Sequence, residues 1–235
     1  AGENKLDFNY LIIALGGESE FYEIPGVQEY AYNLKSIDDA IAMYKKIKEI
    51  YENYQKEKSD RQIKIAVIGG GFTGVELTAE LGCCAGNIIE EYKLSKTCTT
   101  IHLFQADATI LPNINDSARK TIERRLKDEM VQIQTNSPVT EVGPDYIKVK
   151  SGGEPLKFDL IIWAGGVRGS KLLENLGLKL TKKGMVEINE LLQAKNSDGS
   201  INEKVFAIGD CGTYLDLKTQ NPVPAMAYVA HDQAD

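Results

Sequence analysis

The chain has 235 residues, of which 43% are apolar, and carries a formal net charge of -7. This apolar content can bury a sizeable core in one large or two ordinary domains, and the acidic balance argues against nucleic acid as a partner. No apolar run approaches the roughly 20 residues that span a bilayer, and the first residues lack the apolar region of a signal peptide. We therefore expect the chain as given to be soluble.

The first elements are predicted from two apolar patterns. Residues 9–15 form an apolar run that stops at two glycines, which predicts a buried strand. Ser36, with Asp39 three residues later, resembles a capping box, and helical spacing then continues through about residue 57. The apolar stripe of this predicted helix consists of Ile37, Ala40, Ile41, Tyr44, Ile47 and Tyr51.

The stretch from residue 63 to residue 76 runs from β-favouring residues into glycines at 69, 71 and 74. Gly69 would let the chain reverse sharply, Gly71 would let bare backbone approach a pyrophosphate, and Gly74 would let a new helix lie close to the sheet. The N-terminus of that helix would hold the anion through its N–H groups and its dipole. An apolar stripe follows at Leu77, Leu81, Cys84 and Ile88. This context predicts a dinucleotide-binding strand, turn and helix, and a glycine-rich turn without a ligand is the alternative.

The cysteines and histidines are not spaced as metal ligands. Cysteines occur at 83, 84, 98 and 211, without a Cys-x-x-Cys pair, which indicates a reducing, cytosolic environment. Cys84 falls on the apolar stripe, so a buried structural thiol is favoured over a redox role. His102 lies in a predicted strand and is interpreted as a packed or edge histidine. We expect no metal site.

The following segments alternate between strands and helices. In chain order they are a strand at about 100–105, a helix capped by Asn115 through about 128, a strand from 131, a hairpin around Gly143-Pro144 and a buried strand at 160–164 that ends in Gly165-Gly166. Residues 63–166 are therefore expected to close a nucleotide domain with its ligand at the carboxyl ends of the strands.

Two more strands are predicted beyond this domain. Residues 186–189 are typical of an edge strand, and residues 204–210 of a buried strand that ends at Gly209-Asp210. These segments belong with the first strand of the chain. The flanking positions suggest that one domain is inserted into another, with crossings near residues 30–35 and 167–170.

The order of these segments resembles the two-dinucleotide flavoproteins and, within them, the type II NADH:quinone oxidoreductases. Three stretches carry the resemblance, at 21–36, 69–81 and 207–210. It implies an α/β fold in which a Rossmann-type NAD(P)H-binding domain, residues 34–168, is inserted into an incomplete FAD-binding domain, residues 1–33 and 169–235.

The resemblance also implies site residues. The cofactor-binding set would be Gly69, Gly71, Phe72, Thr73, Gly74, Glu76, Gln105, Gly165, Gly166, Gly209 and Asp210. Asp210 would accept a hydrogen bond from a ribityl hydroxyl of FAD, and Gly165 and Gly166 would let the nicotinamide approach the flavin ring. Glu76 matches an acidic residue beside these stacked rings and is the candidate catalytic residue. A glutamate that merely complements the macrodipole in the first turn of a helix is equally open.

Two positions depart from the pattern of the family. Gln105 stands where an acidic residue binds the adenosine ribose of NADH, which predicts use of NADH with weakened discrimination against NADPH, and Asp107 could partly substitute. Residues 224–234 resemble the helix of the quinone site, with Ala227, Tyr228 and Asp232 as substrate-binding candidates. Tyr228 and Asp232 replace two glutamines there, and a helix that merely packs under the flavin is an equal alternative.

The implied activity is hydride transfer from NADH to FAD, followed by electron delivery to a membrane quinone. The full-length protein would contact the inner face of the cell membrane peripherally, with a homodimer possible. The first FAD fingerprint and a C-terminal membrane segment are missing, so we expect a fragment that binds NAD(H) and holds FAD poorly. The alternatives are a disulfide, ferredoxin or sulfide:quinone reductase of the same superfamily, and a nucleotide-binding module without turnover.

Overall fold

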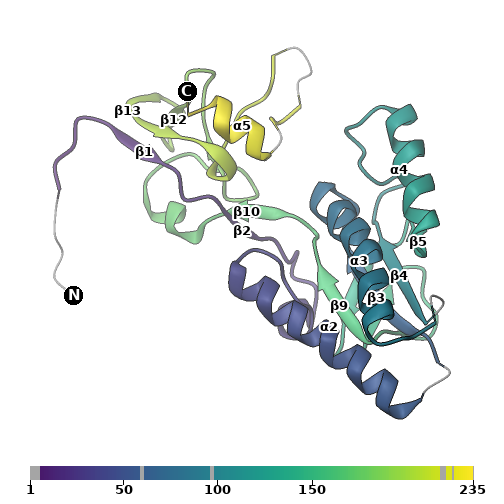
Figure 1. The fold of residues 1–235 in the computed structure, drawn as a ribbon. Helices are drawn as coiled ribbons and strands as arrows, with labels where there is room; N and C mark the ends of the chain where they lie inside the picture. The colour runs from purple at the N-terminus through teal and green to yellow at the C-terminus, as the bar shows by residue number, and fades with distance from the viewer. Residues whose placement is uncertain (1–5, 59–60, 96–97, 218–220, 224, 235) are drawn as a thin grey trace. The chain divides into compact units, whose positions relative to one another are not determined.

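The computed structural model describes residues 6–58, 61–95, 98–217, 221–223 and 225–234 (Figure 1). Contacts divide the chain into two compact units. The larger unit is Phe21–Gly166, and the smaller unit combines Ala1–Glu20 with Val167–Asp235. Each unit has its own buried core.

The larger unit is built on a parallel sheet of four strands in the order β5-β4-β3-β9. Its strands are β3 (Ile63–Ile68), β4 (Thr99–Phe104), β5 (Val131–Gln134) and β9 (Leu160–Trp163). All four were predicted from sequence. In β3 only Lys64 is exposed, and β9 is buried throughout, as expected for parallel strands that are covered on both faces.

Different layers cover the two faces of this sheet. On one face, Ile63, Ile65 and Val67 pack with three helices, which are α2 (Ile37–Glu57), α3 (Phe72–Glu91) and α4 (Asp116–Asp128). On the other face, Ala66 and Ile68 pack with a short helix and an antiparallel sheet. These elements are α1 (Val27–Tyr30), β6 (Val139–Val142), β7 (Tyr146–Val149) and β8 (Leu156–Lys157). The predicted hairpin is confirmed as β6 and β7.

Helix α2 begins and ends where the sequence predicts. Both reciprocal bonds of the capping box form between Ser36 and Asp39. The predicted apolar stripe is only partly correct, because Ile37, Ile41 and Tyr44 are exposed. The buried face is displaced around the helix and consists of Met43, Ile47, Ile50, Tyr51 and Tyr54.

The smaller unit contains short strands around one core. β13 (Ile201–Ala207) pairs in parallel with β1 (Leu11–Ile13) and antiparallel with β12 (Gln193–Lys195). The remaining elements are β2 (Gly17–Ser19), β10 (Val167–Gly169), η1 (Lys171–Asn175), β11 (Val186–Glu187), η2 (Gly209–Cys211), β14 (Gly212–Thr213) and α5 (Ala227–Asp232). The core contains Ile13, Leu173, Leu178, Val186, Ile188, Ala194, Val205, Ala207 and Cys211.

Two burial predictions in this unit were wrong. The strand expected at 9–15 is short, and only Ile13 is buried in it, because β1 is an edge strand that pairs on one side with β13. The strand expected at 204–210 begins at Ile201 and ends at Ala207, and within it only Val205 and Ala207 are buried. Alternate residues of β13 face the core, as in a strand that is covered on one face.

The first crossing between the units lies after Glu20, whereas the sequence placed it after residue 33. The physical reason is the packing of Phe21, Ile24 and Val27 into the core of the larger unit beside β6 and β9. The second crossing lies after Gly166. None of the helices in the described part of the chain combines the length and the hydropathy that crossing a bilayer requires.

Candidate functional site

A glycine turn joins the central strand β3 to helix α3. Gly69 has a φ of 119°, a conformation that side chains disfavour, and its N–H donates to the carbonyl oxygen of Phe104 at 2.8 Å. A Cβ atom at Gly69 would collide with the carbonyl group of Ala164. The close approach of three strand ends therefore requires glycine here.

The other two glycines of the motif differ from each other. A Cβ atom at Gly74 would collide with the carbonyl oxygen of Gly69, so the first turn of α3 lies directly against the glycine turn. At Gly71 a Cβ atom would meet no atom within 4 Å. The fold of the chain itself thus explains glycine at 69 and 74, whereas position 71 borders open space at the N-terminus of α3.

Phe72, Thr73 and Glu76 lie on the exposed side of the first two turns of α3. The N–H groups of a first helical turn have no partner within the helix and point toward its N-terminus. Glu76 is the fifth residue of α3, and the first turn contains no acidic residue. Since the macrodipole acts mainly within the first turn, this placement weakens the dipole explanation for Glu76.

Gln105 is buried behind the glycine turn. Its Oε1 accepts a hydrogen bond from the N–H of Gly70 at 2.9 Å, and its Nε2 donates to Oδ2 of Asp107 at 2.9 Å. A Cβ atom at Gly70 would approach the Cβ of Gln105 to 2.9 Å. Gly70 and Asp107 therefore join the candidate site; Gly70 was not predicted, and Asp107 was predicted only as a partial substitute for an acid at position 105.

Gly165 and Gly166 follow β9, next to the glycine turn in the sheet. A Cβ atom at Gly165 would collide with the ring of Trp163, and Gly166 has a φ of 135°. The hydroxyl oxygen of Tyr22 lies 3.0 Å from the Cβ position of Gly166. The packing of the chain thus gives its own reason for both glycines, in addition to the ligand approach that the sequence suggests.

The candidate FAD residues lie in the smaller unit. Gly209 has a φ of 67°, and its N–H donates to Oε1 of Gln233 at 2.7 Å. Asp210 follows it in η2, close to Gly17. The Cys211 thiol is buried and donates to the carbonyl oxygens of Ile13 and Ile208.

The candidate quinone residues form the short helix α5. Ala227 begins the helix and Asp232 ends it, so it is shorter than the predicted segment, whose first residue, Pro224, lies outside the described residues. Tyr228 and Asp232 are four residues apart and therefore share one helix face. Both side chains are exposed, and α5 buries no residue.

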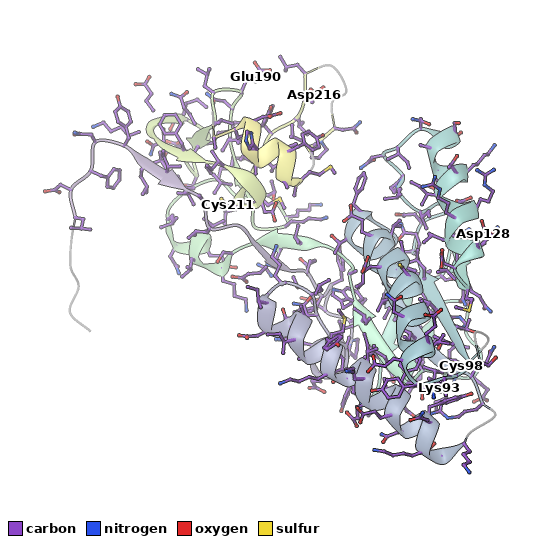
Figure 2. All side chains as sticks on the ribbon, viewed as in Figure 1. Lys93, Cys98, Asp128, Glu190, Cys211 and Asp216 are labelled. Atoms are coloured by element: carbon purple, nitrogen blue, oxygen red, sulfur yellow. The ribbon has the colours of Figure 1, made fainter. Side chains whose placement is uncertain are left out.

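The cysteines and histidines form no metal-ligand group among the described residues. Cys83 is exposed, while Cys98 and Cys211 are buried. Figure 2 labels Cys98, which immediately precedes β4, and Cys211 in η2. The sequence predicts that Cys84 and Ile88 are buried, but their side chains are not among those that the structure describes. His102 is half-buried against Phe104 and Phe158 and contacts Gln134, and burial lowers its pKa. The structure places it as a packed histidine.

Comparison with known proteins supports the same fold. The sequence profile of the pyridine nucleotide-disulphide oxidoreductase family matches residues 1–234. The type II NADH:quinone oxidoreductase of Haemophilus influenzae is 30% identical over 98% of the chain and 54% of that protein. The enzyme of the same name from Staphylococcus aureus is 29% identical over 97% of the chain and 56% of that protein.

Comparison with solved structures identifies oxidoreductases of the same fold. NDH2 from Plasmodium falciparum in complex with NADH aligns with a TM-score of 0.76 and 27% identity, over 89% of this chain and 45% of that chain. The water-forming NADH oxidase from Lactobacillus brevis, at 20% identity and a TM-score of 0.69, shares the fold over 97% of this chain and 45% of that chain. The chain spans about half the length of the curated relatives it matches. It belongs to the pyridine nucleotide-disulphide oxidoreductase family, whose cofactors are FAD and NAD(H).

Proposed function

We propose that this chain contributes the nicotinamide-nucleotide site, and part of the FAD site, of an NADH:quinone oxidoreductase. The observation that carries the proposal is the contrast within the glycine turn. Close packing requires glycine at positions 69 and 74, whereas a side chain at position 71 would extend into open space, so packing gives no reason for glycine there. Its relatives from Haemophilus influenzae and Staphylococcus aureus are type II NADH:quinone oxidoreductases, which suggests the reaction class.

The larger unit would hold NADH at the carboxyl ends of its parallel strands. The pyrophosphate would lie beside Gly71, where it would accept hydrogen bonds from the first N–H groups of α3 and gain from the helix dipole. Phe72 and Thr73 border this position. The nicotinamide would extend toward Gly165 and Gly166, and Glu76, on the exposed side of α3, is the candidate acidic residue of this unit.

The smaller unit would hold part of FAD. Gly209 gives the backbone a positive φ at the end of β13, and Asp210 would accept the hydrogen bond of a ribityl hydroxyl. When bound, FAD supplies the hydride acceptor for NADH and the electron carrier to the quinone. The contribution of each unit is to hold its own nucleotide in a fixed orientation.

The exposed face of α5 is the proposed quinone contact. Tyr228 presents an aromatic ring that could stack on a quinone, and Asp232 lies one turn further along the same face. Ala227, at the start of the helix, is also exposed. This assignment makes α5 the position where electrons leave the flavin.

The coenzyme site is tested by Gly71→Ala. We expect this variant to keep the melting temperature of the parent within about 1 °C, because the added methyl group enters open space, and to lose at least about tenfold in NADH affinity, because the methyl group obstructs the pyrophosphate. Calorimetric titration with NADH measures the affinity, and thermal unfolding measures the stability. Unchanged NADH affinity in the variant would contradict the proposed site.

The quinone step requires the intact protein that carries this sequence. Under anaerobic conditions NADH should bleach its flavin absorbance, and menaquinone or ubiquinone analogues should restore it. The variant Tyr228→Ala should slow reoxidation by quinone and leave reduction by NADH unchanged. Reoxidation by disulfide or ferredoxin acceptors, with no response to quinones, would assign the protein to another reductase class.

A further inference from the structure

We infer that Asp107, held in place by Gln105, reads the adenosine ribose of the coenzyme and makes this site selective for NADH over NADPH. The inference rests on the proposed NADH site and names the residue that sets its specificity. Its basis is the juxtaposition of the glycine turn, the buried Gln105 amide and the Asp107 carboxylate.

Both polar atoms of the Gln105 side-chain amide have hydrogen-bond partners within the protein. The side chain is only 9% exposed, its oxygen accepts from Gly70 and its nitrogen donates to Asp107. A buried amide with satisfied hydrogen bonds is costly to redirect toward a ligand. Gln105 is therefore a positioning residue, and the coenzyme meets the next polar group outward, which is the carboxylate of Asp107.

The backbone fixes Asp107 beside the glycine turn. Its carbonyl oxygen accepts from the N–H of Asn136 at 2.8 Å, and the carbonyl oxygen of Gln105 accepts from Ser137 at 2.9 Å. Further along the same loop, the N–H of Leu111 donates to the carbonyl oxygen of Gly70 at 2.8 Å. The loop after β4 is thus anchored to the turn that would carry the pyrophosphate, with Asp107 exposed between the two anchors.

The Asp107 carboxylate, fixed in position by Gln105, would distinguish NADH from NADPH. One oxygen of Asp107 accepts from Gln105, and the other is available to a ribose hydroxyl group, which a carboxylate binds through a charge-assisted hydrogen bond. The 2'-phosphate of NADPH would replace that hydroxyl donor with negative charge and would be repelled. A glutamine at the strand end therefore does not remove the acid from the site. It relocates the acid by two residues.

The nearest arginine in sequence does not offset this charge. Arg119, the first arginine after β4, donates to the carboxylate of Asp116 at 2.6 Å and to the carbonyl oxygen of Ile114 at 3.1 Å, and its side chain is 12% exposed. Its Nη2 is therefore engaged within α4 and the preceding loop, and its Nε is buried. This arrangement favours NADH, contrary to the weakened discrimination expected from sequence.

The test compares Asp107→Asn with Asp128→Asn in the 235-residue chain. Asp128, labelled in Figure 2, is exposed at the end of α4, just before β5 begins. It therefore lies near the amino end of a strand, whereas the proposed site lies at the carboxyl ends. Both variants remove one negative charge from the larger unit. Calorimetric titration with NADH and with NADPH gives the ratio of dissociation constants without any turnover.

We expect the parent to bind NADH at least about tenfold more tightly than NADPH, the ratio that one charge-assisted hydrogen bond provides. Asp107→Asn should bring the ratio close to one, and Asp128→Asn should leave the parent ratio unchanged. A ratio that survives in Asp107→Asn would overturn the inference and leave the proposed function intact. Failure of the parent to bind either coenzyme would overturn the proposed function itself.

Discussion

Residues of one type serve different physical purposes within this site. Gly69 and Gly74 are required because the turn, the start of α3 and the end of β9 approach too closely for any side chain. Gly71 has room for a side chain, so packing does not require glycine there, whereas the proposed pyrophosphate contact would. The same distinction applies to the acids, because Asp107 is held at the site by an amide whereas Asp128 lies at a distant helix end.

Because Tyr51 is buried in the larger unit, the free energy of unfolding of this unit should fall at alkaline pH. The Tyr51 hydroxyl bonds Oγ1 of Thr99 at 2.7 Å, and burial raises the pKa of Tyr51 from 10.0 to about 12. Because the folded pKa is the higher one, the protonated form stabilises the fold below pH 10, and this contribution is lost as the pH rises toward 12. The loss amounts to about 3 kcal/mol.

Tyr51→Phe should therefore lose about 1 kcal/mol at neutral pH, from the missing bond to Thr99, and should show a flatter decline between pH 10 and 12. Urea unfolding at a series of pH values measures both effects. Tyr44→Phe, at an exposed position of the same helix, is the control and should follow the parent profile. A parent-like alkaline decline in Tyr51→Phe would show that Tyr51 is not the responsible group.

At the residue scale, sequence identified the glycine motif but not the contacts around it. Spacing alone locates Gly69, Gly71 and Gly74, because a tight turn between strand and helix has few sequence solutions. The bond from Gln105 to Asp107 depends on side-chain rotamers and on the path of a loop, which periodicity does not encode. Sequence therefore predicted where the coenzyme would bind but left open which residue would contact the ribose.

Elements with strong local signals were predicted well. Strand β9 is a continuous apolar run, β3 is interrupted only by Lys64, and helix α2 starts at a capping box. Which face of α2 is buried was predicted less well, since Ile41 and Tyr44 match the helical period as well as Met43 and Ile50 do. The contact with the sheet decides between such faces, and that contact is tertiary. Strand β1 shows the same limit, because an apolar run does not reveal an edge position.

The start of α2 depends on one reciprocal pair. Oγ of Ser36 accepts from the N–H of Asp39 at 3.1 Å, and Oδ2 of Asp39 accepts from the N–H of Ser36 at 2.8 Å. Backbone bonds from Lys35 and Ser36 lower the pKa of Asp39, so its contribution is present at neutral pH and declines as the pH falls through the folded pKa.

Ser36→Ala should accordingly lower the free energy of unfolding by about 1 kcal/mol, because one N–H of the first turn loses its acceptor. Ser36→Asp should retain most of the stability, since aspartate also caps helices. Equilibrium unfolding in urea at neutral pH provides the measurement. Ser151→Ala, at an exposed serine after β7, serves as a control and should stay within about 0.5 kcal/mol of the parent. An equally small effect at Ser36 would exclude a stabilising capping box.

At the scale of the whole molecule, the chain leaves the smaller unit and returns to it through paired strands. β2 and β10 pair antiparallel, with Ser19 opposite Val167, and the larger unit begins and ends directly beyond them. Adjacent entry and exit points are the usual requirement for one domain inserted in another. Sequence predicted the insertion from the order of segments, but it misplaced the first crossing because the packing of Phe21 and Val27 is a tertiary contact.

This arrangement predicts that a polypeptide of residues 21–166 folds without the smaller unit. Both cores of the larger unit are formed entirely by its own residues, and its glycine turn, Gln105 and Asp107 are all included. The polypeptide should unfold cooperatively and should bind NADH within about threefold of the affinity of the complete chain, because the proposed contacts to the pyrophosphate and the ribose come from this unit. Calorimetric titration of both proteins provides the comparison, with Gly71→Ala in each as the control for binding at the turn. A folded polypeptide that has lost NADH binding, while the complete chain retains it, would show that residues of the smaller unit are essential to the coenzyme site.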